Sequence, residues 1–121
     1  MSGGPILLVE DDPDIREALR GVLEEEGYGV EEAENGRAAL DRLHGQRPPS
    51  LILLDWMMPI MDGSEFLTAM RQESSLEPIP VVVVSAWTEA AKEEANGVQG
   101  FLQKPVHIDD LLATAARHCR D

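Results

Sequence analysis

The sequence predicts an α/β domain built on a parallel sheet, because short apolar runs alternate five times with amphipathic helical stretches. The runs 6–9, 51–54 and 81–84 contain only Ile, Leu and Val, as expected for strands that helices cover on both faces. The connections are mostly short, which favours right-handed crossovers. A length of 121 residues suits one core, so we expect residues 1–121 to form a single domain.

The first half of the chain supplies two strand–helix pairs. A strand at 6–9 precedes a helix that Asp12 caps and Pro13 opens, and Gly27 ends this helix. Its expected apolar face consists of Ile15, Leu19, Val22 and Leu23. A weaker strand at 28–33 suits a position near the sheet edge, and Asn35-Gly36 turns into a second helix. That helix buries Ala39, Leu40 and Leu43 and is followed by a loop at 45–50.

The second half supplies three more pairs. A strand at 51–55 leads through a loop at 58–63 into a helix that turns Phe66, Leu67 and Met70 inward. Pro78 and Pro80 precede a strand at 81–85, and alanines are the only apolar residues of the helix expected at 88–96. A brief strand at 101–103 leads to Lys104-Pro105 and a last helix. This helix buries Ile108, Leu111, Leu112 and Ala115.

Composition limits the classes of function. The net charge is −13, from 23 acidic residues against 10 Lys and Arg, which argues against direct binding to nucleic acid. Cys119 is the single cysteine and cannot form an internal disulfide, so we expect a reducing compartment. The start of the sequence lacks the features of a signal peptide, and the apolar runs are too short to span a bilayer. We therefore expect a cytoplasmic protein that does not associate with membranes.

Chemistry-bearing side chains follow four of the strands. Glu10 and Asp11 follow the first strand, and Asp55, Ser85 and Lys104 follow the third, fourth and fifth. Because carboxyl ends of parallel strands meet at one edge, these groups should converge where α/β sheets bind ligands. Neighbouring carboxylates repel unless a cation joins them. Hard oxygen ligands suit Mg²⁺, or Mn²⁺ in its place, and the lack of His and Cys in the cluster argues against zinc.

Such a cluster can support phosphoryl transfer. A carboxylate beside a cation can attack phosphorus, while the metal and a lysine share the charge of the phosphoryl oxygens and a serine hydroxyl bonds one of them. Each residue also has an ordinary structural interpretation. Glu10 and Asp11 can cap the first helix, Ser85 can be a common strand-end hydroxyl, and Lys104 can be a solvated loop lysine. Their joint occurrence at successive strand ends favours the phosphoryl site.

The chain resembles the receiver domain of response regulators, the phosphoacceptor module of two-component signalling. The matching stretches lie in the family's order at 6–13, 53–63, 83–86 and 100–105, and they include Glu10-Asp11-Asp12-Pro13 and Lys104-Pro105. The resemblance implies a flavodoxin-like (βα)5 three-layer sandwich with strand order 2-1-3-4-5. It also implies a Mg²⁺-dependent transfer of a phosphoryl group from a partner, either a sensor histidine kinase or a histidine phosphotransfer protein. A downstream target is implied as well, but the sequence does not identify it.

The resemblance also implies roles for individual residues. Asp55 would be the phosphoacceptor, and the metal would be held by Asp55, by Asp11, by Glu10 through water, and by the backbone carbonyl of Met57. Ser85 and Lys104 would contact the phosphoryl group. Phe101 would be the aromatic switch residue, although a core aromatic with one rotamer is the alternative. The bond before Pro105 would be cis.

This sequence departs from the family pattern in three places. The segment 85–104 is shorter than in many members by roughly one helical turn, so no standard dimer is expected. Met57 and Trp87 place bulky apolar groups beside the pocket, and our hypothesis is that they shield the acyl phosphate from water. His107 stands where an acidic helix cap is common.

Two other functions compete with a phosphoacceptor. An aspartate-nucleophile phosphatase of the haloacid-dehalogenase type needs a second aspartate two residues after the nucleophile, and that position is Met57 here. We therefore expect that the chain is not an enzyme and that it catalyses only its own phosphorylation and dephosphorylation. A degenerate receiver that only binds proteins is disfavoured by the intact acids and lysine. The sequence is compatible with a stand-alone regulator or with a fragment of a longer one.

Overall fold

The computed structural model describes residues 4–45 and 47–119. Position 46, inside the loop predicted at 45–50, and the two chain ends lie outside these residues. The described chain alternates strand and helix five times, as the sequence predicts.

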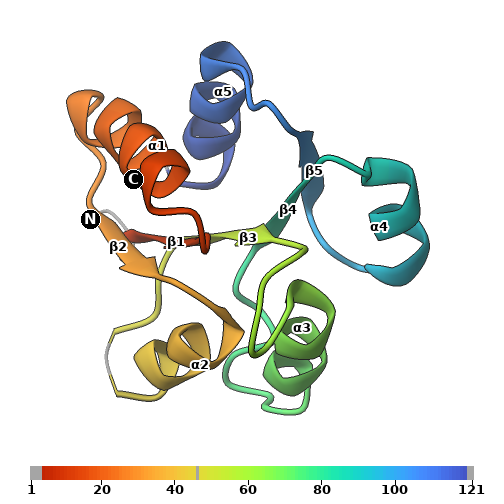
Figure 1. The fold of residues 1–121 in the computed structure, drawn as a ribbon. Coiled ribbons are helices and arrows are strands. Elements are labelled where there is room, and N and C mark those ends of the chain that lie inside the picture. The colour runs from red at the N-terminus through yellow and green to blue at the C-terminus, as the bar shows by residue number, and fades with distance from the viewer. Residues whose placement is uncertain (1–3, 46, 120–121) are drawn as a thin grey trace.

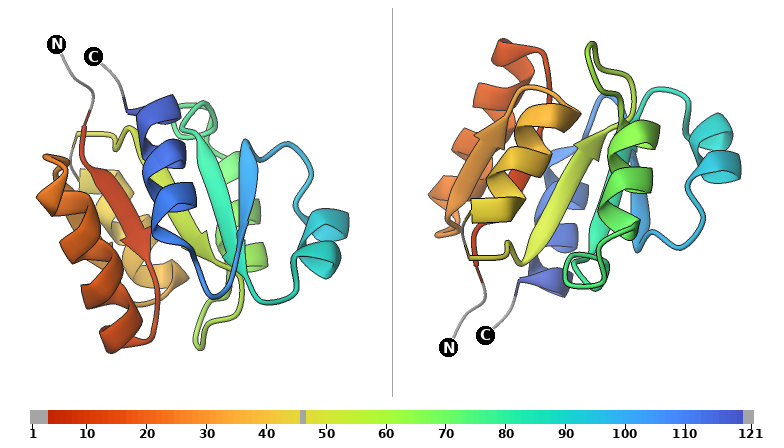
Figure 2. Two further views of the ribbon diagram at one scale, coloured as in Figure 1. Left: turned by 90° about the horizontal axis from the view of Figure 1, so that it is seen from above. Right: turned by 90° about the horizontal axis from the view of Figure 1, so that it is seen from below.

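Five parallel strands form one sheet in the order β2-β1-β3-β4-β5, which confirms the predicted flavodoxin-like topology. The strands are β1 (Ile6–Val9), β2 (Val30–Ala33), β3 (Leu51–Asp55), β4 (Val81–Ser85) and β5 (Gly100–Gln103). β2 begins at Val30 rather than at position 28, and β5 already begins at Gly100. All four strand pairings are parallel, so every strand delivers its carboxyl end to the same edge (Figure 2).

Helices cover both faces of the sheet and give three layers (Figure 1). The helices are α1 (Pro13–Glu25), α2 (Gly36–Gly45), α3 (Gly63–Arg71), α4 (Thr88–Glu94) and α5 (Ile108–His118). α1 and α5 lie on one face, α2 and α3 on the other, and α4 lies beside β5 at the border of the sheet. The core therefore has two apolar layers, one on each face of the central strands.

The central strands are buried because both faces of the sheet are covered. All residues of β1, β3 and β4 are buried, including the polar ends Asp55 and Ser85. Burial of this much apolar side chain is the main favourable term in folding. The uninterrupted apolar runs of the sequence therefore correspond to the middle of the sheet, and their polar ends mark its carboxyl edge.

The start of α1 follows the sequence closely. The Asp12 side chain accepts hydrogen bonds from the backbone N–H groups of Asp14 and Ile15, and Pro13 is the first helical residue. Leu23 is fully buried, as predicted for the apolar face. The burial predicted for Ile108 at the start of α5 is wrong, because 56% of this residue is exposed. The prediction for Ile15 is also wrong, because 37% of this residue is exposed. It lies in the first turn of α1 and borders the carboxyl edge of the sheet instead.

α3 begins at a complete capping box. The Asp62 side chain accepts from the Glu65 N–H, and the Glu65 side chain accepts from the Asp62 N–H. A side chain at Gly63 would collide with Trp56, since a Cβ there would lie 2.7 Å from the indole. Asp62 and Gly63 thus shape the loop and the helix start.

α4 is held by a small set of contacts. Ala91 and Ala95 are its buried apolar anchors, which confirms that alanines supply its inward face. The Lys92 ammonium lies over the Phe101 ring at 5.8 Å from the ring centre. The Trp56 indole N–H donates to Glu94 Oε1 at 3.0 Å. The last turn of α4 is therefore tied to the residue that follows β3.

We expect Glu94→Ala to lower the free energy of unfolding by about 1–2 kcal/mol, because the largely buried Trp56 indole N–H would lose its acceptor. Glu94→Gln keeps an oxygen that can accept this bond and should cost about half as much or less. Urea denaturation of both variants measures the difference. Equal losses for Ala and Gln would show that the hydrogen bond contributes nothing.

Candidate functional site

The carboxyl edge of the sheet carries an open pocket. Its walls come from the loops after β1, β3, β4 and β5, the four loops in which the sequence predicts functional residues. The lining residues are Glu10, Asp11, Asp12, Ile15, Asp55, Met57, Ser85, Ala86, Trp87 and Lys104. The predicted Glu10, Asp11, Asp55, Ser85 and Lys104 are thus brought together in one place.

Lys104 joins the two buried carboxylates of the pocket. Its Nζ lies 3.1 Å from Glu10 Oε1 and 3.3 Å from Asp55 Oδ1. Both acids are almost fully buried, while Lys104 remains partly accessible from the open side. A buried carboxylate is costly without a partner, so this lysine offsets much of the repulsion between Glu10 and Asp55.

Three carboxylates are close enough to share one cation. Glu10, Asp11 and Asp55 each offer an oxygen, and these oxygens lie within 4.8 Å of one another. Asp11 is the more open of the three. Hard, anionic oxygen donors at this spacing, with one side facing solvent, fit a small divalent cation that keeps part of its water shell. The donor set therefore suits Mg²⁺.

The pKa values reflect the crowding of charge. Burial first, and the charge of Glu10 second, raise the pKa of the Asp55 carboxyl to about 7, against the opposing effect of Lys104. Burial alone lowers the pKa of Lys104, but the charges of Asp55 and Glu10 outweigh it and the net shift is upward. Without a cation, the pocket favours a charged lysine and a partly protonated aspartate.

The hydroxyl of Ser85 sits at the end of β4. Ser85 is buried, and its Oγ accepts the backbone N–H of Trp87 at 2.9 Å. The hydroxyl proton is not needed for that bond and can be donated to another acceptor. In the loop after β3, the Met57 N–H approaches Asp55 Oδ1 at 3.4 Å. Backbone groups of both loops thus face the pocket.

Two large apolar side chains flank the opening. Trp87 is 72% exposed and Met57 is 67% exposed, and both line the pocket together with Ile15. These side chains give the charged pocket an apolar rim. Phe101 lies elsewhere: it is partly buried, packs against the layer of α2, α3 and α4, and lies under Lys92.

The loop after β5 completes the edge. The Lys104–Pro105 peptide bond is cis. His107 is the N-cap of α5 and makes no side-chain capping hydrogen bond, so the start of α5 lacks the cap that an acidic residue would give. Asp109 and Asp110 place negative charge in the first turn instead.

Sequence reasoning missed the role of Arg16. Its position off the apolar face of α1 predicts a solvated side chain, but its guanidinium donates to the Glu10 carbonyl at 2.7 Å. It also pairs with Glu32 of β2. The only signal in the sequence is its place one helical turn after the Asp12 cap, where a long cationic side chain can reach back over the end of β1.

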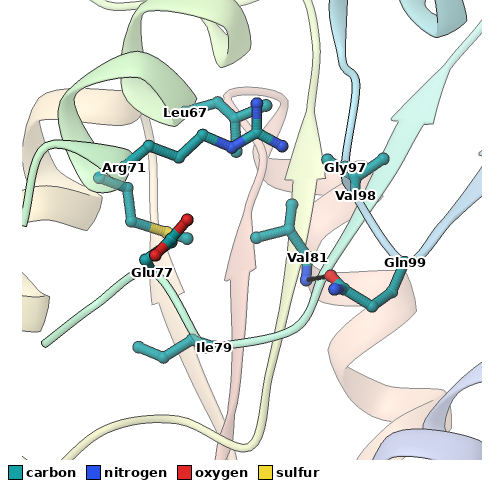
Figure 3. Close-up of a pocket in the computed structure, with 9 residues that line it drawn as sticks. Leu67, Arg71, Glu77, Ile79, Val81, Gly97, Val98 and Gln99 are labelled. Atoms are coloured by element: carbon teal, nitrogen blue, oxygen red, sulfur yellow. Dashed lines mark hydrogen bonds between the residues drawn. The ribbon is translucent and has the colours of Figure 1, made fainter. Parts of the chain in front are cut away.

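A second hollow lies at the opposite edge, near the start of β4, and contains none of the predicted site residues (Figure 3). Its polar groups hold chain segments together: the Gln99 side-chain oxygen accepts the Val81 N–H at 2.7 Å, and Arg71 donates to the Asn96 carbonyl. Gly97 has a φ of +86° and leaves room for the Arg71 guanidinium. These contacts fasten the turn between α4 and β5.

Comparison with known proteins assigns the family. The profile of the response regulator receiver domain matches residues 6–116. The chain is 39% identical over 111 residues to the response regulator MprA of Mycolicibacterium vanbaalenii, covering 89% of this chain and 47% of that protein. It is 35% identical over 117 residues to an uncharacterised protein of Leptolyngbya boryana, covering 94% of this chain and 88% of that one.

Solved structures agree. The chemotaxis response regulator CheY4 of Vibrio cholerae superposes with a TM-score of 0.86 at 33% identity, covering 95% of this chain and 98% of that one. A receiver domain of a Syntrophus aciditrophicus histidine kinase gives a TM-score of 0.84 at 34% identity, covering 95% of this chain and 89% of that one. The chain therefore belongs to the response regulator receiver family, the receiver domains of two-component signalling.

The chain spans about half the length of the MprA proteins that it matches, 47% of the first of them. Across residues 4–45 and 47–119, no helix is both long and apolar enough to cross a membrane.

Receiver domains are signalling modules rather than enzymes with separate substrates, and they bind Mg²⁺ at an acidic cluster like that of Glu10, Asp11 and Asp55.

The raised pKa of Asp55 predicts a pH dependence of stability. The pKa of the Asp55 carboxyl is about 7 in the folded protein and near 3.8 in the unfolded chain. Between these two pH values the folded state binds more protons than the unfolded state. The free energy of unfolding that this group contributes therefore falls as pH rises from about 4 to 7. With EDTA present, Asp55→Asn should be more stable than the wild type by about 1–3 kcal/mol at pH 8 and by much less at pH 4. Urea denaturation at several pH values measures this gap. A gap that does not change with pH would contradict the shift.

Proposed function

We propose that Asp55 accepts a phosphoryl group from a histidine kinase or a histidine phosphotransfer protein in a Mg²⁺-dependent reaction. One observation carries the proposal: the Asp55 carboxylate, buried at the end of β3, lies 3.3 Å from Lys104 Nζ and shares a cation-sized cluster with Glu10 and Asp11. Phosphoryl transfer requires positioning and neutralisation of charge more than covalent help. This pocket supplies both.

The donor groups divide into metal ligands and phosphoryl ligands. Asp11, Asp55 and the Met57 backbone carbonyl would hold Mg²⁺ directly, and Glu10 would hold it through water. When bound, the metal supplies positive charge beside the transferring phosphoryl oxygens. The same charge favours the ionised form of Asp55 and so counters the upward pKa shift that burial causes.

The reaction forms one bond and breaks one. An Asp55 oxygen attacks phosphorus, and the bond between phosphorus and the donor's imidazole nitrogen breaks with its electron pair returning to that nitrogen. Lys104, already aimed at Asp55, would then bind a phosphoryl oxygen, and the Ser85 hydroxyl would donate to another. Ser85 ends β4 and Lys104 follows β5. The phosphorylated aspartate would therefore tighten contacts between the ends of these two strands.

This change would reach the surface formed by α4, β5 and α5. Val83 and Phe101 are partners in the register of β4 and β5, and Ser85 pairs with Gln103. A shift of Ser85 toward the phosphoryl group would leave room for Phe101 to turn inward from its place under Lys92. The surface would then change population between two states rather than adopt a new fold.

The arrangement also bears on the alternatives. Met57 offers no carboxylate two residues after Asp55, which supports a domain that catalyses only its own phosphorylation and dephosphorylation. The complete set of acids and lysine in one pocket does not favour a degenerate receiver. We further infer a cytoplasmic location, a downstream target protein or output domain of unknown identity, and no direct contact of this domain with nucleic acid, as its charge of −13 suggests.

We expect acetyl phosphate with Mg²⁺ to add one phosphoryl group to the wild-type chain, as measured by intact-protein mass spectrometry. Asp55→Asn should abolish the addition, because an amide is not a nucleophile toward phosphorus, and EDTA should suppress it in the wild type. Asp62→Asn is the matched control, since Asp62 caps α3 outside the pocket and Asn also caps well. Full phosphorylation of Asp55→Asn would exclude Asp55 as the acceptor.

We expect Trp87→Glu to shorten the lifetime of the phosphorylated protein, because a polar group at the rim admits and orients water that the exposed indole excludes. A barrier lowered by about 1 kcal/mol corresponds to a roughly fivefold faster loss of phosphate. Trp87→Phe keeps an apolar ring and should stay near the wild-type rate. Decay measured after removal of the phosphodonor gives the rates, and an unchanged rate for Trp87→Glu means that the indole does not shield the product.

A further inference from the structure

Arg16 links the end of β1 to β2 from its place in α1. Its terminal nitrogen donates to the Glu10 carbonyl at 2.7 Å, and its Nε pairs with Glu32 Oε1 at 2.8 Å. The side chain is largely buried by these contacts. A planar guanidinium held at two of its nitrogens has little freedom, so it fixes the direction of the carbonyl that it binds.

That carbonyl belongs to the peptide group that joins Glu10 to Asp11, the two acids contributed by β1. The neighbouring peptide groups are also fixed: the Glu10 N–H donates to the Ala33 carbonyl at 3.0 Å, and the Asp12 N–H donates to Glu10 Oε2 at 3.1 Å. Three successive peptide groups are thus hydrogen-bonded. Arg16 holds the middle one, and Asp11 lies between two fixed groups.

We propose that Arg16 is a positioning residue for the divalent-cation site. By fixing the Glu10–Asp11 peptide, it keeps both side chains directed toward Asp55 before a cation arrives. Without it, the carbonyl can turn to water, and ordering the loop again on cation binding costs conformational entropy. The inference rests on the proposed function, because it assumes that this cluster binds the metal.

Electrostatics alone predicts the opposite sign. Removing a cation near three carboxylates should by itself strengthen the binding of Mg²⁺. A positioning role predicts weaker binding in spite of the lost positive charge. The sign of the change in Kd therefore distinguishes the two effects.

The chain contains a matched control in Arg20, one helical turn further along α1. Arg20 also pairs with Glu32, and it carries the same charge. Its guanidinium pairs with Glu24 and Glu32, whereas the guanidinium of Arg16 bonds the Glu10 carbonyl. Arg16→Gln and Arg20→Gln therefore both remove one positive charge and one partner of Glu32. Only Arg16→Gln also removes the contact with the Glu10 carbonyl.

The test is a titration with MgCl₂ at constant ionic strength, followed by the amide NMR shifts of the pocket, with urea denaturation to show that each variant is folded. We expect Arg16→Gln to raise the Kd for Mg²⁺ about tenfold and Arg20→Gln to leave it within about twofold of the wild type. If Arg16→Gln does not fold, Arg16→Lys replaces it, because lysine keeps the charge but lacks the planar guanidinium that reaches Glu32 and the Glu10 carbonyl together. A weaker affinity for Mg²⁺ in Arg16→Lys then supports the proposal, and an unchanged affinity contradicts it.

Three results would overturn it. An Arg16→Gln variant that binds Mg²⁺ as tightly as the wild type, or more tightly, shows that the carbonyl contact does not organise the site. Equal losses of affinity in Arg16→Gln and Arg20→Gln assign the effect to Glu32 or to charge. In both cases the wild type still binds Mg²⁺, and the proposed function stands. A wild type whose pocket amides do not respond to Mg²⁺ removes the metal site and this inference together.

Discussion

The repulsion between two buried carboxylates at one edge of the sheet is the constraint on which the site depends. Glu10 follows β1 and Asp55 ends the neighbouring β3, and Lys104 forms an ion pair with both. A parallel sheet makes this crowding unavoidable, because it delivers every carboxyl end to the same place. The pocket is thus a place where the fold stores unfavourable charge, and a divalent cation can relieve it.

The rest of the molecule holds the loop after β1 rigidly and leaves the loops after β4 and β5 freer to adjust. β1, β3 and β4 are buried on both faces, and the loop after β1 is fixed by the Asp12 cap and by Arg16. The loops after β4 and β5 carry Ser85 and Lys104 next to the exposed border of the sheet. The acids therefore have a fixed frame, while the groups that would follow the phosphoryl oxygens belong to the part of the sheet with fewer neighbours.

Features governed by local chemistry could be predicted from the sequence. The Asp12-Pro13 helix start, the three apolar central strands and the carboxyl-edge acids depend on residues close together in the chain, and the structure has them as expected. Contacts between distant residues could not be predicted. The bond from Arg16 to the Glu10 carbonyl and the bond from Trp56 to Glu94 depend on how the helices pack on the sheet, and so does the exposure of Ile15.

The seating of α4 has a thermodynamic consequence. Two alanine side chains bury little apolar surface compared with the leucines of α1 and α5, so displacing this helix exposes few methyl groups to water. Its free energy of local opening must therefore lie well below that of global unfolding. The protein can therefore exchange α4 between arrangements at low thermodynamic cost while its sheet stays intact.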